Sequence, residues 1–178
     1  MRYALIVLAI LAAVAVVIVA LGATLPVRHT ASRQIRLQQP AEKVFALIND
    51  PPSFPTWRKS VSKVEMLPDQ NGHRVFREDG KDGSILYEVD SVVPNQRLVS
   101  RIADKSLPFG GKWTYELSGD SGSTMLRITE DGEVYNPVFR FVSRFIMGHT
   151  ATMDRYLSDI ASHFREPGAV VSGTPRSE

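Results

Sequence analysis

Several features that identify common protein classes are missing from this chain of 178 residues. It contains no cysteine, which excludes disulfide bonds, thiolate nucleophiles and cysteine metal ligands. Neither sign of charge dominates, because 21 basic and 19 acidic residues give a formal charge of +2 and are interspersed along the chain. A nucleic-acid-binding protein gathers Lys and Arg on one face. We therefore expect no nucleic-acid partner, whereas the absence of cysteine leaves the cellular compartment open.

Motifs that identify several kinds of enzyme are absent too. The sequence has no Gly-x-Ser-x-Gly nucleophile motif, no phosphate-binding glycine loop and no dinucleotide fingerprint. Its histidines are His29, His73, His149 and His163. The last two would lie about 21 Å apart on one helix, so they cannot share an ion. The sequence therefore predicts no cofactor and no metal site.

The one long hydrophobic run lies at the N-terminus. Residues 4–25 are almost all Ala, Val, Ile and Leu, and no charged residue lies between Arg2 and Arg28. As a helix this run would be roughly 33 Å long, enough for a hydrocarbon core of about 30 Å. We therefore predict that residues 1–27 form a single-pass transmembrane anchor, which places the protein at a membrane.

A cleaved signal peptide is the alternative for this segment, with Ala20 and Gly22 as small residues before the cut. The apolar run is longer than the roughly 7–15 residues of a typical signal core, which favours the retained anchor. Arg28, Arg33 and Arg36 follow the run and favour a cytoplasmic domain. A charge count is weak for one N-terminal span before a folded domain, so the side of the membrane stays open.

The remaining chain, residues 28–165, has the length of one globular domain, and the sequence is 43% hydrophobic and 22% charged. Alternating polar and apolar residues predict a first strand over residues 29–38. Residues 40–48 have a proline-led start and helical spacing, which predicts a short helix, and a second short helix or turn follows at 55–59. Over residues 61–135, turn residues at 69–72, 80–83, 94–95, 110–111 and 119–122 separate about six short strands, which predicts an antiparallel meander.

A long helix is predicted to start at Asn136-Pro137, because Asn caps helices and Pro suits their first turn. Apolar residues then recur every three or four positions and give this helix one apolar face. They are Val138, Val142, Phe145, Ile146, His149, Met153, Tyr156, Leu157, Ile160 and Phe164, with His149 as the exception in polarity. Residues 166–178 are rich in Gly, Pro and Ser, which predicts a disordered tail.

This order of elements predicts an α+β domain in which a curved antiparallel sheet of about seven strands wraps round a long C-terminal helix. Such a sheet is wider than one helix can fill. The two short helices after the first strand would close one end of the space that remains. An internal apolar cavity is therefore expected between the sheet and the helix.

Three segments match a known family. The first segment, residues 35–57, reads as a strand, then Pro-Ala-Glu-Lys-Val-Phe, then a proline-rich turn that ends at Trp57. The second, residues 111–117, is Gly-Lys-Trp-Thr-Tyr-Glu-Leu. The third is the predicted C-terminal helix. On these segments, from about His29 to Phe164, the chain resembles the START-like or SRPBCC superfamily, in particular its polyketide cyclase/dehydrase and lipid-transport group. The resemblance implies the helix-grip fold. It implies no single activity, because the group includes carriers, cyclases and regulators of partner proteins.

Seven residues are predicted to line the cavity and bind a ligand. Side chains alternate between the two faces of a strand, so aromatic residues of one parity should face inward. Glu130 has the parity of Leu126 and Ile128, which places a carboxylate on the apolar face, and His149 could approach it across the cavity. The seven are Trp57, Tyr87, Trp113, Tyr115, Glu130, His149 and Met153. Ordinary core packing is the alternative for the aromatic residues and for His149.

Three functions remain open at this point. The leading hypothesis is a non-enzymatic, membrane-tethered binder or carrier of a hydrophobic, lipid-like small molecule. The second is a polyketide cyclase- or dehydratase-like enzyme in which Glu130 and His149 act as acid and base. The third is a membrane-tethered module that binds a protein partner. The sequence does not identify the ligand, the reaction or the oligomeric state.

Overall fold

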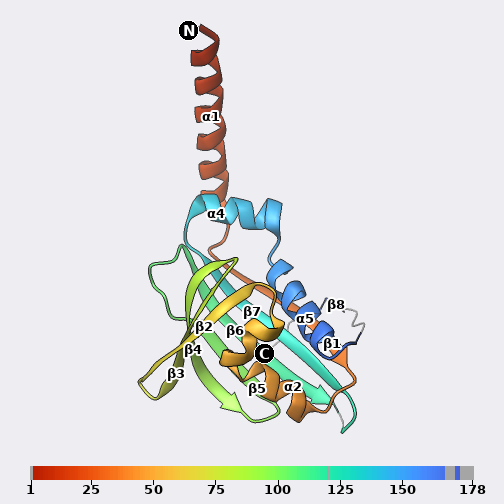
Figure 1. The fold of residues 1–178 in the computed structure, drawn as a ribbon. Coiled ribbons are helices and arrows are strands. Elements are labelled where there is room, and N and C mark those ends of the chain that lie inside the picture. Colours follow the sequence, from red (N-terminus) through yellow and green to blue (C-terminus); the bar gives the residue numbers. More distant parts are fainter. Residues whose placement is uncertain (1, 120, 167–170, 173–178) are drawn as a thin grey trace.

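The computed structural model describes residues 2–119, 121–166 and 171–172, and it consists of an N-terminal helix and a sheet-and-helix domain (Figure 1). The helix, α1 (Arg2–Thr24), rises away from the domain (Figure 1). Among the described residues it is the one helix long and apolar enough to cross a membrane, and no residue of its most apolar stretch is buried. The segment predicted as an anchor is therefore an apolar helix that contacts the domain at its C-terminal end and is otherwise exposed.

The domain begins with a strand and a set of short helices. These are β1 (Arg28–Leu37), α2 (Ala41–Ile48), the 3-10 turn η1 (Pro51–Ser53) and α3 (Phe54–Trp57). Prolines lie in the first turn of η1 and of α3, where the missing N–H leaves no helical hydrogen bond unmade. The strands that follow are β2 (Val61–Gln70), β3 (His73–Gly80), β4 (Gly83–Val93), β5 (Arg97–Ile102), β6 (Phe109–Gly119) and β7 (Thr124–Val134).

All the strands belong to one antiparallel sheet in the order β2-β3-β4-β5-β6-β7-β1-β8. Consecutive hairpins build it from β2 to β7, and β1 then pairs with β7, from Arg28 opposite Glu133 to Leu37 opposite Thr124. The predicted sheet of about seven strands is confirmed. The two-residue strand β8 (Val171–Ser172) adds to its edge and lies in the segment predicted to be disordered. The rest of that segment after Glu166 lies outside the described residues.

Most of the strand connections are the turns that the sequence predicts. Asn71 and Gly72 both have positive φ, 53° and 82°, as a tight hairpin requires. One prediction is wrong, because Gly110 and Gly111 lie inside β6 and residues 103–108 make the connection instead. Gly111 has a φ of 127°, and a Cβ there would lie 2.3 Å from a backbone oxygen of β7. These glycines therefore allow close approach of two strands rather than a turn.

The long C-terminal helix is divided into three parts, which corrects the prediction of one continuous helix. They are α4 (Pro137–Val142), the π-helical turn η2 (Ser143–Met147) and α5 (Ala151–His163). Gly148 ends η2 with a φ of 75°, a conformation that glycine adopts without strain. The apolar spacing continues in phase across this glycine, so periodicity alone could not reveal the break. As a result Phe145 and Ile146, predicted to be buried, are 61% and 71% exposed.

Only α5 packs across the sheet in the manner predicted for the whole helix. Its residues Met153, Leu157 and Ile160 have no exposed surface. They meet sheet residues such as Leu126 and Ile128, which are equally buried. Burying each such side chain contributes about 1.5–3 kcal/mol to folding. The α+β helix-grip fold is therefore confirmed, with a shorter gripped helix.

Candidate functional site

A partly open cavity of about 370 Å³ lies between the sheet and the helices. Its wall is mostly apolar and aromatic, from strands β1 to β7 on the sheet side and from α2, α3, α4, η2 and α5 on the other. Apolar lining residues include Ile48, Phe54, Phe76, Ile85, Val89, Leu98 and Phe139. The space enclosed by the curled sheet is thus not filled by α5 alone, which is the geometry that the order of elements predicts.

Five of the seven residues predicted to bind a ligand line this cavity: Tyr87, Trp113, Tyr115, Glu130 and His149. Burial raises the pKa of Tyr87 and of Tyr115, so their hydroxyl groups stay protonated and can donate hydrogen bonds. These side chains therefore offer aromatic faces with a few polar tips.

Trp57 and Met153 are not among the residues that line this cavity, so its geometry does not support them as ligand-binding residues, and ligand binding by the other five stays a prediction. Trp57 is the last residue of α3, and its ring meets that of Tyr156 on α5 edge-on, with 5.3 Å between the ring centroids. Met153 is fully buried under α5. Trp57 therefore packs between two helices and Met153 packs in the core against the sheet, so both side chains form core instead of cavity wall.

Glu130 lies at the centre of a polar group on the cavity wall. Trp113 Nε1 donates a hydrogen bond of 2.9 Å to Glu130 Oε2, and His29 Nε2 lies 3.3 Å from Glu130 Oε1. The side chain of Glu130 is 21% exposed and that of His29 is 16% exposed. The carboxylate predicted on the apolar face is present, and two neighbours satisfy its oxygens.

His149 reaches this group indirectly. Its ring stacks on the ring of His29, with 3.9 Å between centroids, and its Nδ1 lies 3.1 Å from Ser143 Oγ. In the described contacts it is therefore His29, and not His149, that pairs with Glu130. Burial and the nearby His29 lower the pKa of His149 below its ordinary value, and Glu130 opposes this effect.

A second polar group on the wall is the ion pair of Arg58 and Glu78. Arg58 Nη1 lies 2.6 Å from Glu78 Oε1, and the side chains are only 12% and 10% exposed. The guanidinium also lies 5.0 Å from the ring centres of Phe54 and Tyr156. Burial raises the pKa of Glu78, although Arg58 favours its ionised form. Burial acts to lower the pKa of Arg58, but Glu78 and the aromatic surroundings leave it raised.

His29, Arg58 and Glu78 also line the cavity and were not predicted to do so, although two of them carried a signal in the sequence. His29 has the parity of the buried Ile35 and Leu37 in β1, and Glu78 has the parity of Phe76 in β3. Strand alternation therefore predicted an inward direction for both. Arg58 follows a short helix, where no periodicity fixes the direction of a side chain.

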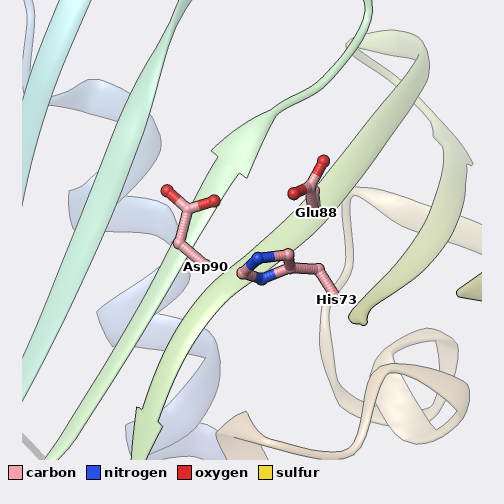
Figure 2. A group of neighbouring side chains, drawn as sticks. All are labelled: His73, Glu88 and Asp90. Atoms are coloured by element: carbon pink, nitrogen blue, oxygen red, sulfur yellow. The ribbon is translucent and has the colours of Figure 1, made fainter. Parts of the chain in front are cut away.

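A further cluster lies away from this cavity wall. His73 on β3 and Glu88 and Asp90 on β4 bring potential ligand atoms within 4.8 Å of one another (Figure 2). Arg101 on β5 already binds both carboxylates, through Nη2 to Glu88 at 2.8 Å and through Nε to Asp90 at 2.6 Å. His73 Nδ1 lies 2.9 Å from Val89 O. The cluster is therefore satisfied as an ion-pair network, and the absence of a metal site stays a prediction.

The sequence model of the polyketide cyclase/dehydrase and lipid transport family matches residues 28–164, which is the domain after α1. The chain belongs to this family. The resemblance seen in the sequence is thus confirmed, and the match begins at the first residue of β1. No curated protein sequence matches the chain.

Solved structures share the fold at low sequence identity. A START superfamily protein from Mycobacterium smegmatis is 16% identical with a TM-score of 0.62, over 77% of this chain and 97% of that chain. The Zhui aromatase/cyclase from Streptomyces sp. R1128 is 13% identical with a TM-score of 0.63, and the match covers 78% of this chain and 94% of that chain. Norcoclaurine synthase from Thalictrum flavum is 11% identical with a TM-score of 0.61, and the match covers 79% of this chain and 88% of that chain. Proteins with this fold thus include enzymes, and the likeness of this chain to them extends to the fold alone.

Proposed function

We propose that the protein is a membrane-tethered binding or carrier domain for a hydrophobic, lipid-like small molecule. The observation that carries this proposal is the partly open, mostly apolar cavity of about 370 Å³. Its size lies in the range of about 300–1,000 Å³ that holds small-molecule ligands. Each methylene group buried there contributes about 0.8 kcal/mol to binding, so an apolar chain or ring system gains most from this wall.

The polar groups of the wall support an amphipathic ligand. Ser100 lines the cavity, and its Oγ lies buried just behind the cavity surface without a hydrogen-bond partner among the described residues. The wall also carries charged groups of both signs, among them Glu130, which pairs with His29, and Arg58, which pairs with Glu78. A hydroxyl or carboxyl group on an otherwise apolar molecule would satisfy Ser100 and leave the charged pairs intact. The ligand therefore carries few polar atoms.

The tether is supported by α1. This helix of 23 residues is about 34 Å long, its apolar stretch is not buried in the domain, and no acidic or basic residue follows Arg2 within it. A cleaved signal peptide has the same appearance, so the mature N-terminus decides between them. Intact-mass measurement of the membrane-bound protein should give the full chain. A mass that lacks residues 1–22 would contradict the tether.

The test of ligand binding uses the purified full chain. Organic extraction followed by mass spectrometry should recover an apolar compound, and titration with fluorescent fatty acids or sterols should saturate. Ser100→Leu fills the cavity and should weaken binding at least tenfold, or about 1.4 kcal/mol. Ser118→Leu, at an exposed position on β6, is the matched control. Absence of both a bound compound and saturable binding would exclude the carrier function.

A cyclase or dehydratase is a second candidate, because His29 and Glu130 form a hydrogen-bonded pair on the cavity wall. In this reading the two residues move protons to and from a carbonyl compound. The pair replaces the earlier assignment of His149, which stacks behind His29. Poly-β-ketone thioester analogues should lose water in the presence of the protein. Glu130→Gln should reduce that rate about 100-fold or more without reducing affinity, and absence of any product would exclude the enzyme.

A further inference from the structure

The segment formed by α4 and η2 exposes an unusual amount of apolar surface. Val138 is 40% exposed, Phe139 48%, Phe145 61% and Ile146 71%. We call these four residues the apolar ridge. Isolated exposed apolar residues are ordinary in proteins, but four within one short helical segment mark a surface that contacts something apolar.

The apolar ridge is held at the foot of α1. Arg140 Nη1 donates a hydrogen bond of 2.7 Å to Leu25 O at the end of α1. Gly22 is buried, and a Cβ there would lie 1.9 Å from Pro137 O, so only glycine allows this contact. Figure 1 shows α1 rising from the domain while α4 lies across its base. The direction of α1 therefore fixes the direction of the segment.

The depth of the segment follows from the length of α1. A hydrocarbon core of about 30 Å takes about 20 helical residues. Counted from Tyr3, the first apolar residue of α1, that length ends at Gly22. Because α4 contacts Gly22, a membrane spanned by α1 would place α4 and η2 at the boundary between hydrocarbon and headgroups.

We propose that residues 137–147 form an interfacial helix, whose apolar ridge inserts into the bilayer that α1 spans. The proposal rests on the tether inferred above. Arg144 is exposed in the same segment, and a cation there suits lipid phosphates. Phe139, Ser143 and His149 also line the cavity. The cavity edge that these residues form therefore faces the lipid, so a ligand leaves the bilayer without crossing water.

The absence of cysteine makes a direct test simple, since one introduced cysteine can be labelled alone. The full chain is reconstituted into phosphatidylcholine–phosphatidylglycerol vesicles with an environment-sensitive dye at Phe145→Cys. Met66→Cys on β2, 43% exposed, is the matched control on the domain, and Leu11→Cys reports the span. Quenchers are lipids with a shallow nitroxide, lipids with a deep nitroxide, and aqueous iodide.

The dye at position 145 should be quenched by the shallow lipid nitroxide several-fold more than the dye at position 66, and protected from iodide. Equal iodide quenching at 145 and 66, with deep quenching at 11, would overturn the inference and leave the tether standing. Protection from both iodide and lipid nitroxides would overturn it in favour of a protein contact. Absence of lipid quenching at position 11 would remove the tether and the inference together.

A transfer measurement separates this inference from the carrier function. Phe145→Ser combined with Ile146→Ser should slow uptake of a fluorescent fatty acid from vesicles several-fold and leave its equilibrium affinity unchanged. Met66→Ser is the control. Unchanged uptake would overturn the role of the apolar ridge in ligand entry. Lipid quenching at position 145 without any fatty-acid binding would instead support the interfacial helix and contradict the carrier function.

Discussion

Among single residues, the buried ion pair of Arg58 and Glu78 is the contact whose loss should be felt most. Both side chains are nearly inaccessible, and the pair lies on the wall of a mostly apolar cavity. Removing one partner leaves a charge that water cannot solvate, whereas removing both leaves none. The pair is therefore weak as a source of net stability but costly to break.

Glu78→Leu should lower the free energy of unfolding by about 3–5 kcal/mol, because the cation of Arg58 stays buried without its partner. The change is measured as the shift in the midpoint of chemical denaturation at an unchanged slope. Combining Glu78→Leu with Arg58→Met should restore much of the loss. An equally large or larger loss in the double variant would show that the pair itself, and not the unpaired charge, sets stability.

Gly22 is the residue on which the junction of α1 and α4 depends. Gly22→Leu would place a side chain where Pro137 O lies, so α4 must leave the base of α1. We expect faster proteolysis after Arg140 and Arg144 in the variant, measured on vesicle-bound protein. Ala20→Leu, at an exposed position of the same helix, should leave the cleavage rate unchanged. Equal rates in both variants would mean that α4 is not held through Gly22.

Among the elements, the connection of η2 to α5 through Gly148 is the part most able to respond to pH. His149 follows this glycine, stacks on His29 and lies near Glu130 and Arg144. Its pKa is lowered in the folded arrangement by burial first and by His29 second. An opened segment has the ordinary pKa of about 6.5, so it binds a proton first as the pH falls.

Acidification should therefore loosen this connection. Well above pH 6.5 His149 is neutral in both arrangements and its contribution to stability is constant. As the pH falls through about 6.5, the opened arrangement binds a proton first and the closed arrangement loses stability. Amide hydrogen exchange over residues 143–152 should be faster at about pH 5.5 than at about pH 7.5, after correction for intrinsic rates. His149→Gln removes the titrating group and should flatten this dependence. The same pH dependence in that variant would assign the effect to another group.

For the whole molecule, α1 and the domain are separate units joined at one contact area. The family match begins at residue 28, and solved relatives with the fold are covered over 97% and 94% of their length by the domain. The described contacts of α1 to the domain include Gly22 with Pro137 and Leu25 with Arg140. The domain therefore has its own core, to which α1 does not contribute.

Removal of residues 1–25 should release the protein from membranes and leave a domain that unfolds cooperatively and binds its ligand with similar affinity. The physical reason is that the core and the cavity wall come from residues after Val27. Flotation on a density gradient, a circular dichroism melt and the fatty-acid titration are the measurements. A truncated chain that fails to fold would show that α1 is part of the domain.

The amino-acid sequence alone determined those features of this protein that depend only on residues close together in the chain. The length of the apolar run and its lack of charged residues predict α1, because a helix makes its backbone hydrogen bonds within itself and needs only apolar side chains in an apolar environment. Turn residues such as Asn71-Gly72 and the cap at Asn136 place the strands and the start of α4, because φ and capping are local properties. Strand parity predicts the inward direction of Glu130 and Tyr115.

Only the tertiary structure decided which distant groups meet. His29 reaches Glu130 because β1 pairs with β7, with Ala31 opposite Glu130 and His29 opposite Gly132. Arg58 finds Glu78, and Trp57 turns into the helix seam, through packing that no spacing in the sequence encodes. One glycine, Gly148, ended a helix that apolar periodicity continues. Periodicity reports which residues prefer burial, whereas pairing register, a single backbone torsion and the space left between sheet and helix determine where each of them goes.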